Sequence, residues 1–199
     1  MVNIVEIAER IHEFSKGMNG VFSLADLQNL VGNESSGAFY RRLKRLEEAG
    51  ILTRFARGFY VCKNFDPLVL SQRIAPESYV SFGTVLAREL LIGSIPAHRV
   101  LAVKPGPARK YEGQGLLLEH LHITNSMFFG YNVTEGVKLA LPEKAVLDVL
   151  YFYKRGRKFS FDIYSDIDYS GLDKKKFDCF LGRYADSRFV EFCRRLVNA

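Results

Sequence analysis

Closely spaced turn signals divide the first third of this chain into short segments. The interruptions fall at Gly17–Gly20, Gly32–Ser36, Gly50 and Gly58. Apolar residues between Ile4 and Phe14 recur at helical spacing and predict a first helix with one apolar face. A chain with turns at such short intervals has to build its core from several small elements.

The next two segments also have the marks of helices. Ser23 is placed to cap a short second helix, which Gly32 ends. The polar residues Asn33–Ser36 can cap a third helix, which we expect to run to about Ala49 with Gly50 as its left-handed cap.

A β-hairpin is predicted directly after the third helix. The β-prone stretches ILTRF and GFYVC are separated by Ala56-Arg57 and Gly58. Three helices followed by a hairpin are the element order of a winged helix-turn-helix. We therefore expect an α+β chain that begins with such a domain over residues 1–64.

Residues 65–199 have a different pattern, and the NFDP at 64–67 marks the junction. Stretches at 99–103, 116–123 and 136–141 are rich in Val and Leu and predict strands. Pro142 opens an amphipathic helix, and apolar spacing predicts a helical tail over about 172–199. We expect a mixed α+β domain here.

The third helix combines a narrow apolar face with a cationic one. At about 100° per residue, Leu43 and Leu46 fall within roughly 40° of Phe39 and form the core face. Most of the neighbouring cations lie opposite that face. Because a helix-turn-helix presents the first half of this helix to the major groove, we expect double-stranded DNA as the partner. The candidate DNA-binding residues on helix and hairpin are Ser36, Tyr40, Arg41, Arg42, Lys44, Arg45, Arg54, Arg57 and Lys63.

A protein-interaction role for the same domain stays open. Residues 1–63 carry nine Lys or Arg and seven Asp or Glu, so their net charge is only +2. Winged helices also dock partner proteins, and a basic helix face can simply be solvated. The alternative is therefore an adaptor whose winged helix binds a protein rather than DNA.

The remaining motifs do not complete a catalytic, cofactor or metal site. Asp166, Asp168, Ser170 and Gly171 begin like a calcium loop, but Phe177 stands where a glutamate ligand is needed. His120 and His122 share one strand face without a recognisable third ligand. The segment 106–115 lacks P-loop spacing and is expected to be a solvated hairpin loop.

An enzymatic reading of the second half ranks lowest among the hypotheses. It would use Asp162, Asp166 and Asp168 beside basic segments to process nucleic acid. No partner motif accompanies these carboxylates. We expect a chain that is not an enzyme and that needs no cofactor or metal.

Composition indicates a soluble, reduced protein. The formal net charge of the 199 residues is +6, and the three cysteines form no CxxC motif. The start lacks the pattern of a signal peptide, and no apolar run reaches the roughly 18 residues of a membrane helix. We expect a cytoplasmic location and no membrane partner.

Beyond the hairpin the chain contains SYVSFGTVLARELLIGSIP at 78–96, FFG at 128–130 and VKLALPEKAVLDVLYF at 137–152. Together these stretches resemble the AbiEi antitoxin family. The most specific part is Pro142–Ala145 with Asp148 following. One departure lies at Glu89-Leu90-Leu91, where members often have a glycine at the helix end.

This resemblance implies a transcriptional regulator of a type IV toxin–antitoxin operon of the abortive-infection kind. The N-terminal domain would repress its own operon by binding inverted repeats. The C-terminal domain would act as the antitoxin against a nucleotidyltransferase toxin without forming a stable complex.

Overall fold

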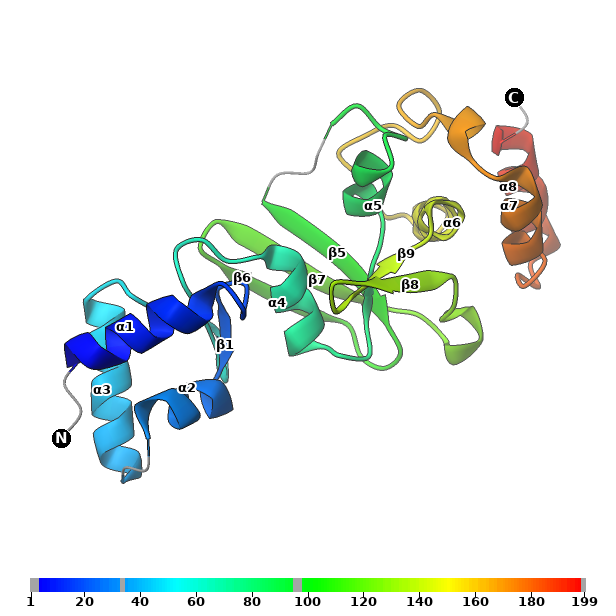
Figure 1. The fold of residues 1–199 in the computed structure, drawn as a ribbon. Coiled ribbons are helices and arrows are strands. Elements are labelled where there is room, and N and C mark those ends of the chain that lie inside the picture. Colours follow the sequence, from blue (N-terminus) through cyan, green and yellow to red (C-terminus); the bar gives the residue numbers. More distant parts are fainter. Residues whose placement is uncertain (1–3, 33–34, 95–97, 198–199) are drawn as a thin grey trace. The chain divides into compact units, whose positions relative to one another are not determined.

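The computed structural model describes residues 4–32, 35–94 and 98–197 and has both helices and sheets, which confirms the α+β class (Figure 1). Two compact units make up the chain. The N-terminal unit comprises residues 1–70 and 111–115, and the C-terminal unit comprises 71–110 and 116–199. Of the expected polar turn, Asn33 and Glu34 lie outside the described residues.

The N-terminal unit has the element order of a winged helix-turn-helix. Its elements are α1 (Ile4–Ser15), β1 (Val21–Ser23), α2 (Leu24–Val31), α3 (Ser36–Glu48), β2 (Thr53–Ala56) and β3 (Phe59–Val61). The three strands form an antiparallel sheet in the order β1-β3-β2. Strand β1 is an addition to the elements that the sequence predicts.

Local capping explains where the helices of this unit begin and end. The Ser23 hydroxyl accepts a hydrogen bond from the Asp26 amide at 3.2 Å, and the Asp26 carboxylate accepts from the Ser23 amide at 2.7 Å. The Ser35 hydroxyl caps α3 by accepting a hydrogen bond from the Ala38 amide at 3.4 Å. Gly50 follows that helix with a φ of +68°, the left-handed conformation that favours glycine.

The predicted apolar faces meet in one core. Ile7 and Ile11 of α1 pack in the same cluster as Phe39, Leu43 and Leu46 of α3. All five side chains are buried, which confirms the expected core face of the third helix.

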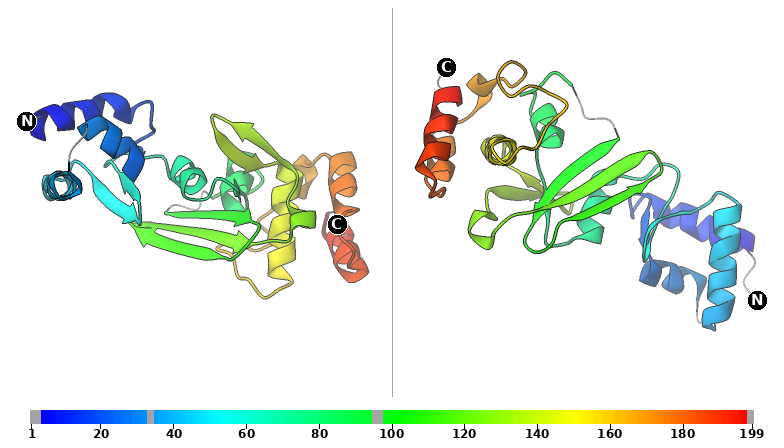
Figure 2. Two further views of the ribbon diagram at one scale, coloured as in Figure 1. Left: turned by 90° about the horizontal axis from the view of Figure 1, so that it is seen from below. Right: turned by 180° about the vertical axis from the view of Figure 1, so that it is seen from behind.

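The C-terminal unit is built around a mixed sheet. Its strands are β4 (Tyr79–Val80), β5 (Arg99–Lys104), β6 (Arg109–Gly113), β7 (Leu116–His122), β8 (Tyr131–Thr134) and β9 (Val137–Ala140). Residues 111–113 of β6 are counted with the N-terminal unit in the division given above. They are ordered β6-β7-β5-β4-β9-β8, with β5 parallel to β7 and β4 parallel to β9. Figure 2 shows β5 and β7 side by side in both further views.

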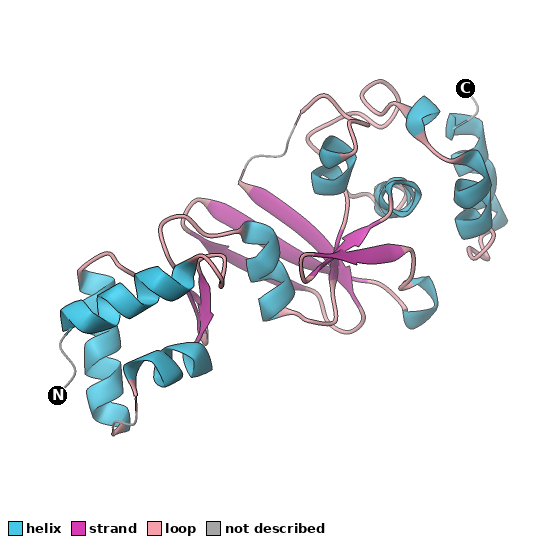
Figure 3. Ribbon diagram, viewed as in Figure 1, coloured by secondary structure: helices cyan, strands magenta, loops and turns pink. Residues whose placement is uncertain are grey.

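Helices dominate the rest of this unit. They are α4 (Pro67–Ile74), which spans the division between the units, α5 (Gly83–Arg88), α6 (Pro142–Tyr153), α7 (Lys174–Leu181), α8 (Ser187–Val197) and the short η1 (Asn125–Met127) and η2 (Tyr169–Gly171). Helices α5, α7 and α8 all pack against α6. Figure 3 shows only helices and loops in the described chain after β9, so the helical tail is confirmed.

Three strands of this sheet differ from the expectation. Strand β6 lies inside the segment 106–115 that we expect to be a loop, and β4 and β8 are additional. The physical reason is length, because two to five residues carry too little alternation to stand out.

A buried polar cluster joins α6 to β4 and to the segment after α7. The Lys144 ammonium donates to the Asp148 carboxylate four residues along α6, and also to the Tyr184 hydroxyl at 3.2 Å. Asp148 accepts further hydrogen bonds from the hydroxyls of Tyr79 at 3.0 Å and Ser81 at 2.8 Å. Lys144 and Asp148 are both fully buried, so this pair acts inside the fold.

Among the described residues, no helix is both long enough and apolar enough to cross a membrane.

Candidate nucleic-acid interface

A groove of about 460 Å³ opens between α3 and the β2–β3 hairpin. Helix α3 contributes Tyr40 and Lys44, which lie one turn apart on its exposed side. The hairpin contributes Arg54 from β2 and Arg57 from the turn. Four of the nine predicted DNA-binding residues therefore converge on one surface.

Apolar and aromatic side chains form the rest of this groove. Leu24 and Leu43 line it beside Tyr60, which lies on β3 and is buried. Burial raises the pKa of the Tyr60 hydroxyl, and the nearby Glu47 carboxylate raises it further. Tyr60 therefore stays a neutral hydrogen-bonding group at physiological pH.

The charge of the groove is positive. Lys44, Arg54 and Arg57 face one carboxylate, Glu47, among the described residues that line it. Lys44 also lies 3.7 Å from Glu48, but both side chains are mostly exposed. Such a solvated pair contributes little and separates easily. The three cations are thus available to an anionic partner.

The hairpin turn brings Arg57 to the groove edge. Gly58 has a φ of +82°, a conformation that residues other than glycine rarely adopt. Strand β2 carries an irregularity between Arg54 and Ala56, which sharpens the local twist. Arg54 is exposed while Phe55, its neighbour, is buried.

The remaining cations of α3 lie on its other sides. Arg41 and Arg45 are exposed outside the groove, and Arg41 folds back along the helix. Its Nη1 lies 3.6 Å from where a Cβ on Gly37 would stand. Ser36 is exposed in the first turn. The first turn of α3 therefore presents small residues with an arginine over them.

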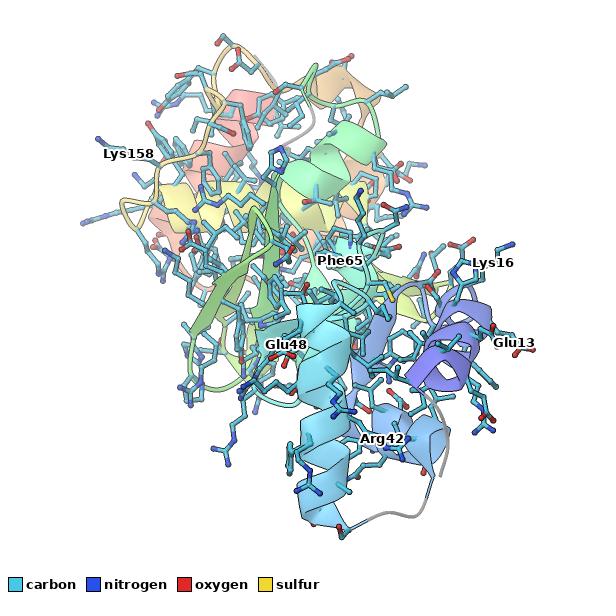
Figure 4. The ribbon with its side chains drawn as sticks, turned by 90° about the vertical axis from the view of Figure 1, so that its left-hand side faces the viewer. Glu13, Lys16, Arg42, Glu48, Phe65 and Lys158 are labelled. Carbon is cyan, nitrogen blue, oxygen red and sulfur yellow. The ribbon has the colours of Figure 1, made fainter. Side chains whose placement is uncertain are left out.

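Two predicted residues have different surroundings. Arg42 is half-buried, and Figure 4 shows it on the flank of α3 beside α2, with Glu48 at the C-terminal end of the helix. Lys63 follows β3 and lines a separate hollow with Ser15 and Asn64. Neither residue lines the groove.

Sequence reasoning missed the other residues that shape the groove. Leu24, Glu47 and Tyr60 contact the same space as the cations. Alternation along the hairpin places Tyr60 on one face of β3, but nothing in a single sequence shows that this face meets α3. Only the tertiary arrangement reveals it.

The three aspartates that the enzymatic hypothesis would use cap turns in the C-terminal unit. Asp162 accepts hydrogen bonds from the amides of Tyr164 and Ser165, and Asp166 accepts from the Asp162 amide at 2.7 Å. Asp168 accepts from the Ser170 amide at 2.9 Å. The hydrogen bond from the Asp162 amide lowers the pKa of Asp166, and those from the Ser170 hydroxyl and amide lower the pKa of Asp168.

The histidine pair of β7 is divided between two environments. The His120 ring is buried, with its Nε2 3.1 Å from the Ser71 hydroxyl. His122 is exposed, and its Nδ1 lies 2.8 Å from the Gly106 carbonyl oxygen. Within the part of the chain that the structure describes, no three His, Cys, Asp or Glu side chains gather closely enough to hold a metal ion.

Comparison with known proteins extends the fold assignment. No protein-family model and no curated protein matches the chain. Among solved structures, the chain is similar to the RV2827C protein from Mycobacterium tuberculosis, with a TM-score of 0.62 and 12% sequence identity. The match covers 92% of this chain and 73% of that one. The likeness spans both units, and at this identity it concerns the fold alone.

Proposed function

We propose that this protein binds double-stranded DNA through its winged helix and represses transcription. The convergence of Tyr40, Lys44, Arg54 and Arg57 on one groove carries this proposal. Cationic and hydroxyl side chains on a helix and an adjoining turn suit the phosphates that flank a major groove. These contacts fix the register of the protein on the duplex.

We assign base recognition to the exposed face of α3 next to the groove. Arg41 lies over the small first turn of the helix, where a recognition helix enters the major groove. Arginine forms two hydrogen bonds to O6 and N7 of guanine, so Arg41 and Arg45 are the residues proposed to read sequence. In this proposal the groove residues determine affinity and these two arginines determine specificity.

The biological setting follows from the resemblance to AbiEi antitoxins. The protein would be cytoplasmic, would bind inverted repeats upstream of its own toxin–antitoxin operon, and would use its C-terminal unit as the antitoxin. Its functional partner would be a nucleotidyltransferase toxin that it counters without a stable complex. The Pro142–Ala145 stretch supports this setting at the level of sequence. No enzymatic activity is proposed.

Fluorescence anisotropy with the upstream region of its own gene tests the DNA-binding proposal. The wild type is titrated at several salt concentrations against that duplex and a scrambled one. We expect the double variant Arg54→Ala/Arg57→Ala to weaken binding to both duplexes and to reduce the salt slope by about 2. The double variant Lys174→Ala/Lys175→Ala removes the same charge from exposed positions of α7 and serves as the matched control.

The Arg41→Ala variant tests sequence recognition separately from the general electrostatic attraction to DNA. It should reduce discrimination between the two duplexes by about 1–3 kcal/mol and leave binding to the scrambled duplex nearly unchanged. Equal, weak binding of the wild type to both duplexes at about 150 mM salt would reject the repressor proposal.

A protein-binding adaptor is the second candidate. Tyr40 is 53% exposed beside the groove, and tyrosine is enriched at protein interfaces. Residues 1–63 also carry a net charge of only +2. Stable co-purification with the product of a neighbouring gene, lost on Tyr40→Ala and without DNA affinity, would favour this candidate over the repressor.

A further inference from the structure

The N-terminal unit contains a second hollow that the DNA-binding proposal does not use. It has a volume of about 370 Å³, within the range of small-molecule sites. Helix α1, the turn after α3 and the residues that follow β3 form its walls. Lys63, predicted to bind DNA, lines this hollow instead of the groove.

The floor of the hollow is apolar. Ala8 and Ile11 of α1 meet Ile51 from the turn after α3, and Ile11 is buried. Cys62 adds a half-buried thiol whose pKa is raised by burial, so the sulfur stays protonated and uncharged. Such a floor suits the hydrocarbon part of a ligand.

The rim of the hollow is polar and its only formal charge at neutral pH is positive. It is formed by His12, Ser15, Lys63 and Asn64. Among the described residues that line the hollow, none is Asp or Glu. An ammonium group and further hydrogen-bonding groups above an apolar floor complement an apolar molecule that ends in a carboxylate.

We infer that this hollow binds a small organic acid, with its apolar body on the floor and its carboxylate at Lys63. The binding site stands on the lining residues alone. Its proposed consequence rests on the DNA-binding function.

The position of the hollow connects such a ligand to both DNA-binding elements. Gly50 and Ile51 lie directly beyond α3, and Cys62 is the residue after β3. A ligand seated among them contacts the ends of the recognition helix and of the hairpin. If it binds the free and DNA-bound forms differently, it changes DNA affinity by the same factor by which DNA changes ligand affinity.

An NMR titration with sodium benzoate, with benzamide as the uncharged control, tests the site. We expect saturable shifts at the amides of Ala8, Ile51 and Cys62, and benzoate affinity about fivefold or more above that of benzamide. Lys63→Gln should lower benzoate affinity by about the same factor and leave benzamide binding unchanged.

The control variant is Lys16→Gln. Figure 4 shows Lys16 projecting from the turn that follows α1, and it does not line the hollow. It should bind benzoate as the wild type does. Equal binding of benzoate and benzamide, shifts confined to the outer face of α3, or no saturable shift with either compound would overturn the inferred site.

The regulatory consequence has its own readout. Saturating benzoate should move the midpoint of the DNA titration for the wild type and not for Lys63→Gln. An unmoved midpoint in a protein that binds both DNA and benzoate would overturn the regulatory part. A protein that binds benzoate and no DNA would instead reject the proposed function and leave the site standing.

Discussion

Single residues within the C-terminal unit show what the most specific sequence motif does. Lys144 and Asp148 belong to the stretch that carries the family resemblance, and both are fully buried. The ammonium contacts one carboxylate oxygen, while Tyr79 and Ser81 donate to the other. A buried ion pair needs all of its partners, because a lone buried charge is costly. We therefore assign this motif to the stability of the fold.

Replacing Lys144 by methionine tests that assignment. The change leaves the Asp148 carboxylate buried without its cation, and we expect the free energy of unfolding to fall by about 3–5 kcal/mol. Urea denaturation measures it. Lys158→Met, at the exposed position shown in Figure 4, should change stability by less than about 0.5 kcal/mol. Similar effects of the two changes would contradict the assignment.

Leu90 has an unfavourable backbone conformation without burial to compensate for it. Its φ is +59° and its side chain is 85% exposed, at the left-handed cap of α5. We predict that Leu90→Gly raises the free energy of unfolding by about 1 kcal/mol, since it relieves the strain and removes little packing. Leu90→Ala keeps the strained φ and should gain much less in the same urea experiment.

At the scale of elements, the sequence predicts helices better than strands. The helices carry apolar residues over two or more turns, and caps such as Ser23 and Gly50 indicate their ends. Strands β1, β4 and β8 are short, and the partners of β1 and β4 lie far away in the chain. Pairing of that kind is a tertiary property that local pattern does not encode.

For the candidate site, too, the local features can be predicted from the sequence and the tertiary ones cannot. The sequence alone predicts the positive charge at Lys44, Arg54 and Arg57, because the element order indicates which helix and which hairpin carry these residues. The groove itself depends on Tyr60 and Leu24 meeting α3 in space. Lys63 is displaced from the groove because the chain after β3 lies beside α1, which no local signal indicates.

The capping box of α2 gives a prediction at this scale. Ser23→Ala removes the hydroxyl that accepts from the Asp26 amide and leaves that amide without its cap. We expect a loss of about 1 kcal/mol in the stability of the N-terminal unit. Thermal unfolding followed by circular dichroism measures it. Ser160→Ala, at an exposed position in a loop, is the comparison and should have no measurable effect.

For the molecule as a whole, stability should depend on pH through one buried imidazole. Burial lowers the pKa of His120, and the Lys104 ammonium lowers it further, to about 4. A backbone hydrogen bond at Ser71 and the Glu77 carboxylate oppose the shift without cancelling it. In the unfolded chain the same ring titrates near 6.5. Between these values the unfolded state binds the additional proton, so acid favours unfolding.

The free energy of unfolding of the C-terminal unit should therefore fall by up to about 3 kcal/mol between pH 6.5 and pH 4. Urea denaturation at closely spaced pH values measures the slope. His120→Gln should flatten the curve in this window, whereas His122→Gln, which alters an exposed ring, should not. A slope that persists in His120→Gln would assign the acid sensitivity to other groups.

The sheet of the C-terminal unit ends in two unlike strands, and this difference bears on aggregation. Strand β6 carries the charged residues Arg109, Lys110 and Glu112, which oppose pairing with another chain. Strand β8 carries Tyr131–Thr134, has no formal charge and holds Val133 65% exposed. In concentrated solution, β8 is therefore the edge at which copies of the protein are expected to add strand to strand. Val133→Lys should slow the growth of light scattering in such samples without altering the fold.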